Sequence, residues 1–334
     1  MTGFGIELLL MLVVILAAAE IFTNALEHLG DRMGISEGVT GSLFAAIGTA
    51  LPETLVPILA IVAGTPDKNI NEQIGVGAIL GAPLMLSTLT TFLMAATAFK
   101  TRGLTGRITP EVSGFTRDMN FFLLAFSLAA IAMFLPQASL ARIVLSIALV
   151  GLYVLYVVTT VRASKSLVED GHGTEAEHPM LFTRIGLKET TFTLCIQLAC
   201  GLALLVFGAK GFINGIEGVS QAIGISPLIL SLLIIPIATE LPEKINSILW
   251  VRRGKDTLAF GNITGAMVFQ GTLLPALGIL LTPWQPSREV LPGMVITMVS
   301  AAWLRLNASK AGLRIPALAV CGALYATYLV ITLG

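Results

Sequence analysis

Long apolar runs recur along this chain, and they have the length that a helix needs to cross a lipid bilayer. A hydrocarbon core about 30 Å thick is crossed by roughly 20 apolar residues in helical form. The runs are separated by short polar stretches, as in membrane proteins with several spans. They predict ten membrane helices, over residues 5–27, 37–64, 74–98, 118–136, 140–162, 190–214, 226–251, 258–282, 290–305 and 314–333.

The composition fits the bilayer as the main solvent and excludes several classes of function. Charged residues make up 12% of the 334 residues, against about 25% in soluble domains, and the mean hydropathy is +0.88. The formal net charge is zero, so we expect no nucleic-acid partner. The sequence has no phosphate-binding loop of the form G-x-x-x-x-G-K-[ST], so we expect no nucleotide. We also expect no cofactor and no enzymatic activity, because the apolar composition excludes a soluble enzyme.

The distribution of basic residues predicts how the chain is oriented in the membrane. Fifteen lysines and arginines fall in the odd-numbered loops between the predicted helices, and three fall in the even-numbered loops. Because basic loops stay in the cytoplasm, both termini are predicted to lie outside. The polar loop over 164–189 is then cytoplasmic. The lack of a large cytoplasmic domain is typical of a minimal prokaryotic protein, so we expect the plasma (inner) membrane.

The chain contains an internal repeat. The stretch GISEGVTGSLFAAIGTALPE begins at Gly34, and GISPLILSLLIIPIATELPE begins at Gly224. The two copies start five predicted helices apart, so the second is inverted relative to the bilayer. We therefore predict an all-α membrane protein of two inverted five-helix repeats, over 1–163 and 190–334. Inverted repeats with broken helices and a site at the bilayer midplane are typical of secondary transporters.

Each copy carries the same polar set near the middle of a predicted span. Glu53 is an ionisable residue near the middle of a predicted membrane span, where burying a charge costs free energy. It is therefore a candidate functional residue. Thr49 lies four residues earlier, on the same helix face. Pro52 has no N–H to donate, so the carbonyl of Gly48 is left free. The second copy holds the corresponding residues Glu243, Thr239, Pro242 and Ala238.

Inversion brings the two polar sets face to face at one depth. Carboxylate, hydroxyl and carbonyl oxygens are the ligands that hard cations such as calcium or sodium prefer. The repeat therefore predicts a midplane cation site, with inorganic cations and the lipid bilayer as the partners of the protein.

These segments resemble a known family. GTALPE and ATELPE, followed by GAILGA and DTLAFGNITGA, are similar to the alpha repeats of the sodium/calcium exchanger branch of the calcium/cation antiporters. The resemblance implies that Glu53 and Glu243 are the principal calcium ligands, with Thr49 and Thr239 as further ligands. The similarity of the motifs covers roughly residues 34–95 and 224–280. The rest of the chain resembles the family through its ten-helix inverted topology.

The sequence departs from the family pattern at the positions that help to form sodium sites. The serine after the motif threonine is Ala50 in the first copy and Glu240 in the second, and a polar position further on is Leu86 and Gln270. These changes put ordinary sodium coupling in doubt. Glu240 adds a third carboxylate, which either carries a proton or is neutralised by Lys244 one turn away.

We therefore interpret the chain as a secondary active cation antiporter. It moves Ca2+ or a similar cation by alternating access, in exchange for H+ or Na+. Two alternatives use the same residues: a cation channel, and a transport-inactive membrane scaffold of the same fold.

Overall fold

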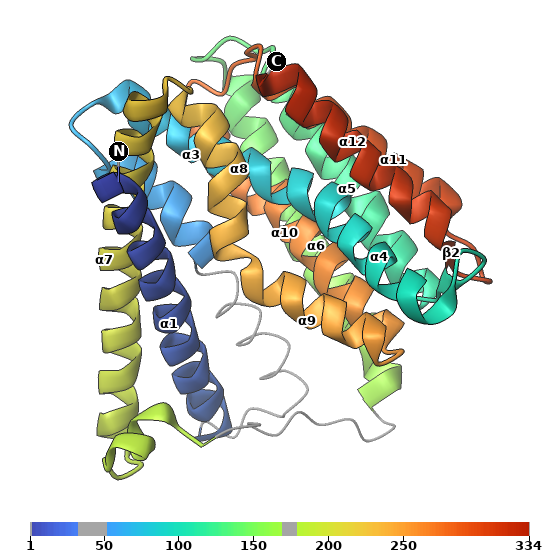
Figure 1. The fold of residues 1–334 in the computed structure, drawn as a ribbon, viewed down its shortest axis with the longest axis horizontal. Coiled ribbons are helices and arrows are strands. Elements are labelled where there is room, and N and C mark those ends of the chain that lie inside the picture. The colour runs from blue at the N-terminus through green and yellow to red at the C-terminus, as the bar shows by residue number, and fades with distance from the viewer. Residues whose placement is uncertain (1, 33–51, 169–178, 334) are drawn as a thin grey trace. The chain divides into compact units, whose positions relative to one another are not determined.

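The computed structural model describes residues 2–32, 52–168 and 179–333, and nearly every element in them is a helix (Figure 1). The helices of the first part are α1 (Thr2–Arg32), an unlabelled helix (Pro52–Ala63), α3 (Lys68–Met85), the π-helical turn η1 (Leu86–Thr90), α4 (Thr91–Arg102), α5 (Val112–Ala132) and α6 (Leu140–Val168). Those of the second part are the 3-10 turn η2 (Leu181–Ile185), α7 (Thr191–Ile223), α8 (Pro227–Thr239), α9 (Leu241–Arg252), α10 (Asp256–Leu281), α11 (Val290–Asn307) and α12 (Ile315–Leu333).

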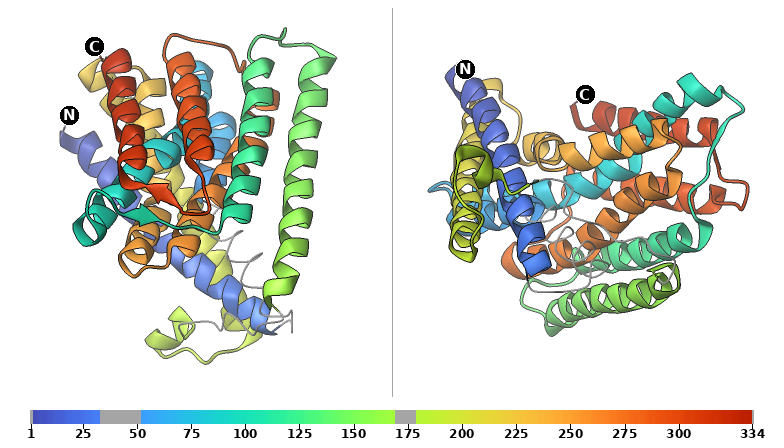
Figure 2. Two further views of the ribbon diagram at one scale, coloured as in Figure 1. Left: turned by 90° about the vertical axis from the view of Figure 1, so that its right-hand side faces the viewer. Right: turned by 90° about the horizontal axis from the view of Figure 1, so that it is seen from below.

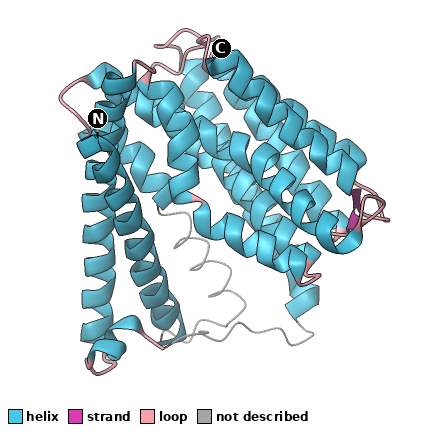
Figure 3. Cartoon of the chain, viewed as in Figure 1, coloured by secondary structure: helices cyan, strands magenta, loops and turns pink. Residues whose placement is uncertain are grey.

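The strands of the described residues form one small antiparallel ribbon (Figure 3). Strand β1 (Arg107–Ile108) pairs with β2 (Leu313–Arg314), with Arg107 opposite Arg314 and Ile108 opposite Leu313. The ribbon joins the loop after α4 to the loop before α12, so it ties two distant parts of the sequence together.

The membrane-spanning, all-helical prediction is confirmed in its coarse form. The described residues contain eight helical stretches that are long and apolar enough to cross a bilayer, and two shorter apolar helices. The eight match predicted runs. The predicted span over 226–251 begins with the shorter apolar helix Pro227–Ile237, and the described part of the predicted span over 37–64 contains the helix Pro52–Ala63. The count of ten spans and the two-repeat division stay predictions.

The chain packs as two compact units that each draw on both halves of the sequence. One unit comprises Met1–Asn71 and Thr159–Ile225, and the other comprises Glu72–Val158 and Ser226–Gly334. These units group residues by packing, whereas the predicted domains 1–163 and 190–334 group them by repeat.

The first unit is built around the antiparallel pair α1 and α7, which lie side by side (Figure 1). Glycines of α7 face α1 at spacings of seven residues. A Cβ added at Gly201 would lie 2.9 Å from the Phe22 backbone nitrogen, and one at Gly208 would lie 3.0 Å from Ile15. The missing side chains therefore let the two backbones approach closely, as small residues do between membrane helices.

A buried amide pair fastens the chain before α7 to the same helix pair. The Asn24 side-chain oxygen accepts hydrogen bonds from Leu181 N at 2.8 Å and from Gln197 Nε2 at 2.9 Å. Gln197 in turn accepts from Phe182 N at 3.0 Å. Asn24 and Gln197 are both buried, and their hydrogen bonds satisfy each other and the backbone.

In the second unit, α3 packs directly on α8 through a G-x-x-x-G pair. A Cβ at Gly77 would lie 2.0 Å from Ser231 Oγ, and one at Gly81 would lie 2.2 Å from the carbonyl oxygen of Leu232. Elsewhere in this unit, α5 packs on α10 and α11, and α12 packs on α4 and α11 (Figure 2). The contact between α3 and α8 sets the distance between the two elements that hold the candidate site.

Replacing Gly81 with alanine is expected to destabilise the second unit. The added methyl would overlap a backbone carbonyl, which cannot rotate away, so the helices must separate at a cost of about 1–3 kcal/mol. Gly151→Ala is the control, because a Cβ at Gly151 meets no atom of the described residues within 4 Å. Thermal unfolding in detergent should show a lower midpoint for Gly81→Ala alone; equal midpoints would contradict the close contact.

Candidate cation site at a helix break

A break in the helical path places Glu240 between α8 and α9. Its backbone has φ −103° and ψ 9°, in the sparsely populated bridge region where many active-site residues lie. The prediction of one helix over 226–251 was therefore wrong. The physical reason is Pro242, which has no N–H for the carbonyl of Ala238 and is tolerated in the first turn of a new helix. The carbonyl of Ala238, which was predicted to lack its helical N–H partner, thus lies at the break.

The Glu240 carboxylate is fully buried and contacts both a charged and a polar side chain. Its exposed fraction is 0%. Oε1 accepts a hydrogen bond from Gln270 Nε2 at 2.9 Å, and Oε2 lies 3.3 Å from Lys244 Nζ. The structure thus brings together Glu240 and Gln270, which the sequence proposed separately. It also pairs Glu240 with Lys244, which was one of the two alternatives left open for this carboxylate.

The Lys244 ammonium bonds two more groups from different elements. Nζ donates to the carbonyl oxygen of Pro236 at 2.7 Å and lies 3.0 Å from Met85 Sδ. Pro236 belongs to the last turns of α8, and Met85 is the last residue of α3. A buried ammonium is costly unless its donors are used, and here α3, α8 and the break at Glu240 supply the acceptors.

Helix α3 ends beside this position and continues into a wide turn. Pro83 lies inside α3 and cannot donate a backbone hydrogen bond, and the π-helical turn η1 begins three residues later. Ser87 Oγ donates to the carbonyl of Pro83 at 2.8 Å. Ser300 Oγ of α11 donates to the carbonyl of Ser87 at 2.7 Å. Such π turns are frequent at functional sites, and this one directly follows Met85, which contacts Lys244.

Thr239, the other predicted ligand at the break, is buried and bonded to its own helix. Its hydroxyl donates to the carbonyl of Ile235 at 3.2 Å. A threonine bonded in this way keeps its oxygen lone pairs available, so Thr239 can still act as an oxygen ligand.

The remaining predicted ligands lie in the first unit or outside the described atoms. Glu53 belongs to the first unit, lies in the described helix Pro52–Ala63 and is 5% exposed. Thr49 and Gly48 lie outside the described residues, and so do the side chains of Glu243 and Ala238, whose backbones belong to α9 and α8. The pairing of Glu53 with Glu243 stays a prediction.

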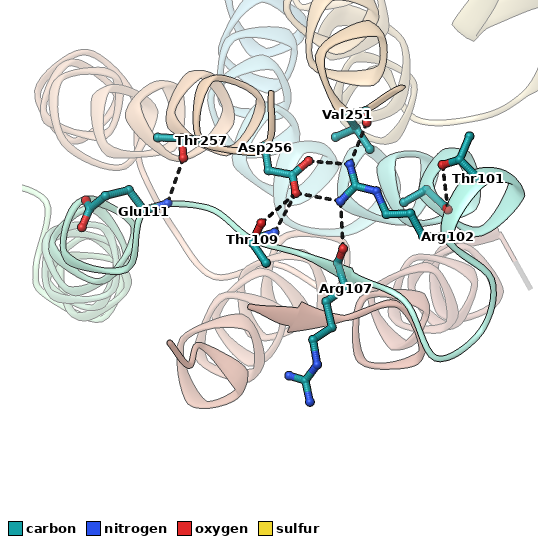
Figure 4. A network of polar contacts seen from close by, with 9 residues as sticks. Thr101, Arg102, Arg107, Thr109, Glu111, Val251, Asp256 and Thr257 are labelled. Atoms are coloured by element: carbon teal, nitrogen blue, oxygen red, sulfur yellow. Dashed lines mark hydrogen bonds and ion pairs between the residues drawn. The ribbon is translucent and has the colours of Figure 1, made fainter. Parts of the chain in front are cut away.

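A second polar cluster, which the sequence reasoning missed, closes the far end of α9 (Figure 4). Arg102 binds Asp256 with two parallel bonds of 2.7 Å, one to each carboxylate oxygen. It also donates to the carbonyls of Arg107 at 2.8 Å and Val251 at 2.9 Å. Thr109 N adds a bond of 2.8 Å to the Asp256 carboxylate.

The Arg102–Asp256 cluster joins the ends of α4 and α9 to the start of α10. Bidentate arginine–carboxylate pairs are the most geometrically specific ion pairs. The sequence contained a signal for each residue separately: Arg102 is a basic residue at the end of one helix, and Asp256 is an acidic residue at the start of another.

Asp118 is a further buried acid that the sequence reasoning missed. Its Oδ2 accepts a hydrogen bond from Thr264 Oγ1 at 2.6 Å, and its Oδ1 lies 3.4 Å from Arg117 Nη2. Asp118 is buried on α5, and Thr264 is buried on α10. An ionisable residue inside a membrane helix is a signal of function. This signal was missed because the predicted span began at Asp118, which placed the residue at a helix end, whereas α5 begins at Val112.

Comparison with known proteins agrees with this arrangement of helices. A family model described as "Sodium/calcium exchanger protein" matches residues 5–162 and 193–334. A relative from Alkalimonas amylolytica, named "Putative antiporter CaxA", is 27% identical over 282 residues, which are 83% of this chain and 81% of the relative. The inner membrane protein YrbG of Escherichia coli (strain K12) is 26% identical over 280 residues, 83% of this chain and 79% of its own.

Two kinds of solved structure share the fold. The crystal structure of the H+/Ca2+ exchanger CAX superposes with a TM-score of 0.70 at 18% identity, over 99% of this chain and 86% of that one. The sodium-calcium exchanger NCX_Mj, soaked with Na+ and Sr2+, gives a TM-score of 0.59 at 19% identity, over 98% of both chains. At these identities the likeness concerns the fold alone.

Proposed function

Because this chain belongs to the sodium/calcium exchanger protein family, we propose that it is an antiporter that moves Ca2+ across the membrane in exchange for protons. Membership in the family supports cation antiport in general. The identity of the two exchanged ions is the finer proposal, and it depends on how charge is distributed at the helix break.

We assign the transported Ca2+ to the paired motif glutamates. Two carboxylates balance the charge of one divalent ion, and oxygen ligands suit a hard cation. The remaining proposed ligands are the hydroxyls of Thr49 and Thr239, the carbonyls of Gly48 and Ala238, and the side chains of Glu240 and Gln270. The recurrence of the set in both repeats supports this assignment.

The ion pair between Glu240 and Lys244 is the observation that carries the choice of counter-ion. Its separation is 3.3 Å, and both side chains are buried. A third carboxylate would otherwise favour binding of extra monovalent cations, but here its charge is already compensated. Glu53 and Glu243 are then left for exchange, and two carboxylates that release a divalent ion can take up protons in its place.

Alternating access requires one part of the protein to move relative to another. We propose that α1 and α7 move together, because they pack on each other along their length and belong to the same compact unit. The glycines of α7 that face α1 allow this close pairing.

Flux in proteoliposomes tests the exchange. With Ca2+ at equal concentration on both sides, an imposed pH gradient is expected to drive Ca2+ accumulation, because proton movement is coupled to it. An imposed Na+ gradient at constant pH is expected to drive none. Accumulation driven by Na+ alone would contradict the proposed counter-ion. Ca2+ conductance without accumulation would favour a channel, and the absence of any flux would favour a scaffold.

The orientation of the chain is tested separately, with single cysteines and an impermeant thiol reagent. We propose that both termini lie outside and that the loop 164–189 is cytoplasmic, in the inner membrane of a prokaryotic cell. A cysteine at either terminus should therefore react in intact spheroplasts, and one in the loop should react only after lysis. The basic residues of the odd-numbered loops are the reason. A terminus that is labelled only after lysis would contradict this orientation.

A further inference from the structure

The Lys244 ammonium is surrounded in the way a bound cation is. Its nitrogen contacts a carboxylate oxygen of Glu240 at 3.3 Å, the carbonyl oxygen of Pro236 at 2.7 Å and the sulfur of Met85 at 3.0 Å. We propose that these groups form a monovalent-cation site at the helix break, that Lys244 fills it as a tethered cation, and that removing the lysine opens the site to Na+.

The charges of the two helix ends favour a cation at this point. The ammonium lies against the carbonyl of Pro236, in the last turns of α8, where the helix dipole presents partial negative charge. Glu240 stands immediately before α9, where the dipole presents partial positive charge and stabilises a carboxylate. The broken helix thus creates a negative position and a positive position side by side, and Lys244 and Glu240 occupy them.

The ammonium occupies the cation position beside Glu240. One carboxylate oxygen of Glu240 contacts the ammonium, and the other accepts a hydrogen bond from Gln270 at 2.9 Å. An alkali ion cannot take the position beside this oxygen while the Lys244 ammonium is there. The lysine therefore excludes a monovalent ion that the same oxygens would otherwise attract.

Met85 favours the ammonium over a metal ion. A thioether is a soft and weak ligand, whereas alkali ions prefer hard oxygen ligands. The sulfur can accept a weak hydrogen bond from an ammonium, and it lies at the right distance to do so. The oxygens define a cation position, and the sulfur makes the lysine the better occupant. Lys244 is thus a specificity-determining residue.

This inference rests on the proposed function, because it assumes that the helix break binds cations. It concerns binding alone, so it can be tested without measuring transport. The variant Lys244→Met keeps the length of the side chain and removes its charge. In detergent, its thermal unfolding midpoint is measured in NaCl and in choline chloride at equal ionic strength. We expect the midpoint of Lys244→Met to rise in NaCl by several degrees more than that of the wild type, because Na+ binds beside Glu240 in the folded state.

Two further variants identify the site. Lys244→Arg keeps the positive charge, so it should show the Na+ response of the wild type. Glu240→Gln/Lys244→Met lacks the carboxylate that would hold Na+, so the additional response should disappear. A folded Lys244→Met protein with the same Na+ response as the wild type would overturn the inference, and so would an additional response that survives in the double variant.

If Lys244→Met does not survive purification, its yield of monodisperse protein is compared after extraction in NaCl and in choline chloride. Recovery that depends on Na+ supports the inference, and failure in both salts overturns it. Because these readouts are independent of flux, the inference can fail while Ca2+/H+ exchange is demonstrated, or hold while exchange is absent.

Discussion

Glu53→Gln and Glu243→Gln are each expected to reduce Ca2+ transport to background while leaving folded protein in the membrane. Each change removes one negative charge from a site for a divalent ion, and the low dielectric of the bilayer interior prevents water from replacing it. Uptake of radioactive Ca2+ into proteoliposomes, driven by a pH gradient, measures the effect. Elution in size-exclusion chromatography confirms that each variant is folded.

A matched control removes a carboxylate elsewhere in the chain. Glu217 of α7 accepts a hydrogen bond from Gln221 at 3.2 Å on the exposed side of that helix. Glu217→Gln should therefore transport at the rate of the wild type. If Glu53→Gln or Glu243→Gln also retains near wild-type transport, that glutamate is not a principal ligand.

The location of the membrane helices could be predicted from the sequence, because each depends on a local run of apolar residues. Helix α6 begins at Leu140, at the start of its predicted run. The interruption at Glu240 could not be placed in the same way. Thr239 and Leu241 are compatible with a continuous apolar span, so the break depends on proline at 242 and on the groups that receive the Glu240 side chain.

The contacts of the candidate site required the three-dimensional structure, except where the residues lie one helical turn apart. Glu240 and Lys244 have that spacing, and their pairing was foreseen as an alternative. Met85 and Gln270 reach the same pair from α3 and α10, and the packing of α3 on α8 at Gly77 and Gly81 brings Met85 close. A single sequence, read without aligned relatives, carries no signal for such contacts.

The Arg102–Asp256 cluster shows the same limit at a greater distance. The two residues are 154 positions apart, and each looks in isolation like an ordinary charge at a helix end. Their bidentate bond forms because the end of α4 and the start of α10 meet beside the carbonyl of Val251. Charge type alone gave no reason to choose this partner among the basic residues of the neighbouring loops.

Glu240→Gln is expected to destabilise the folded protein by about 3–5 kcal/mol, because it leaves the Lys244 ammonium buried without a counter-charge. Glutamine has nearly the same shape, so the loss reflects the charge rather than a cavity. Lys244→Met should be destabilising for the reciprocal reason. Unfolding is measured in choline chloride, so that no alkali ion can replace the ammonium. Glu189→Gln is the control, since Glu189 pairs with His28 at 3.4 Å and is 45% exposed, and such surface pairs contribute about 0–1 kcal/mol.

The double variant Glu240→Gln/Lys244→Met completes a thermodynamic cycle. Removing both charges leaves neither ion uncompensated, and neutral replacement of a buried pair is often tolerated. The double variant should therefore be more stable than either single variant, and the cycle should give a favourable coupling energy of about 2–3 kcal/mol for residues in direct contact. Additive losses would mean that the two side chains act independently. The Glu240 charge would then be uncompensated in the folded state, and the argument for protons as the counter-ion would lose its main support.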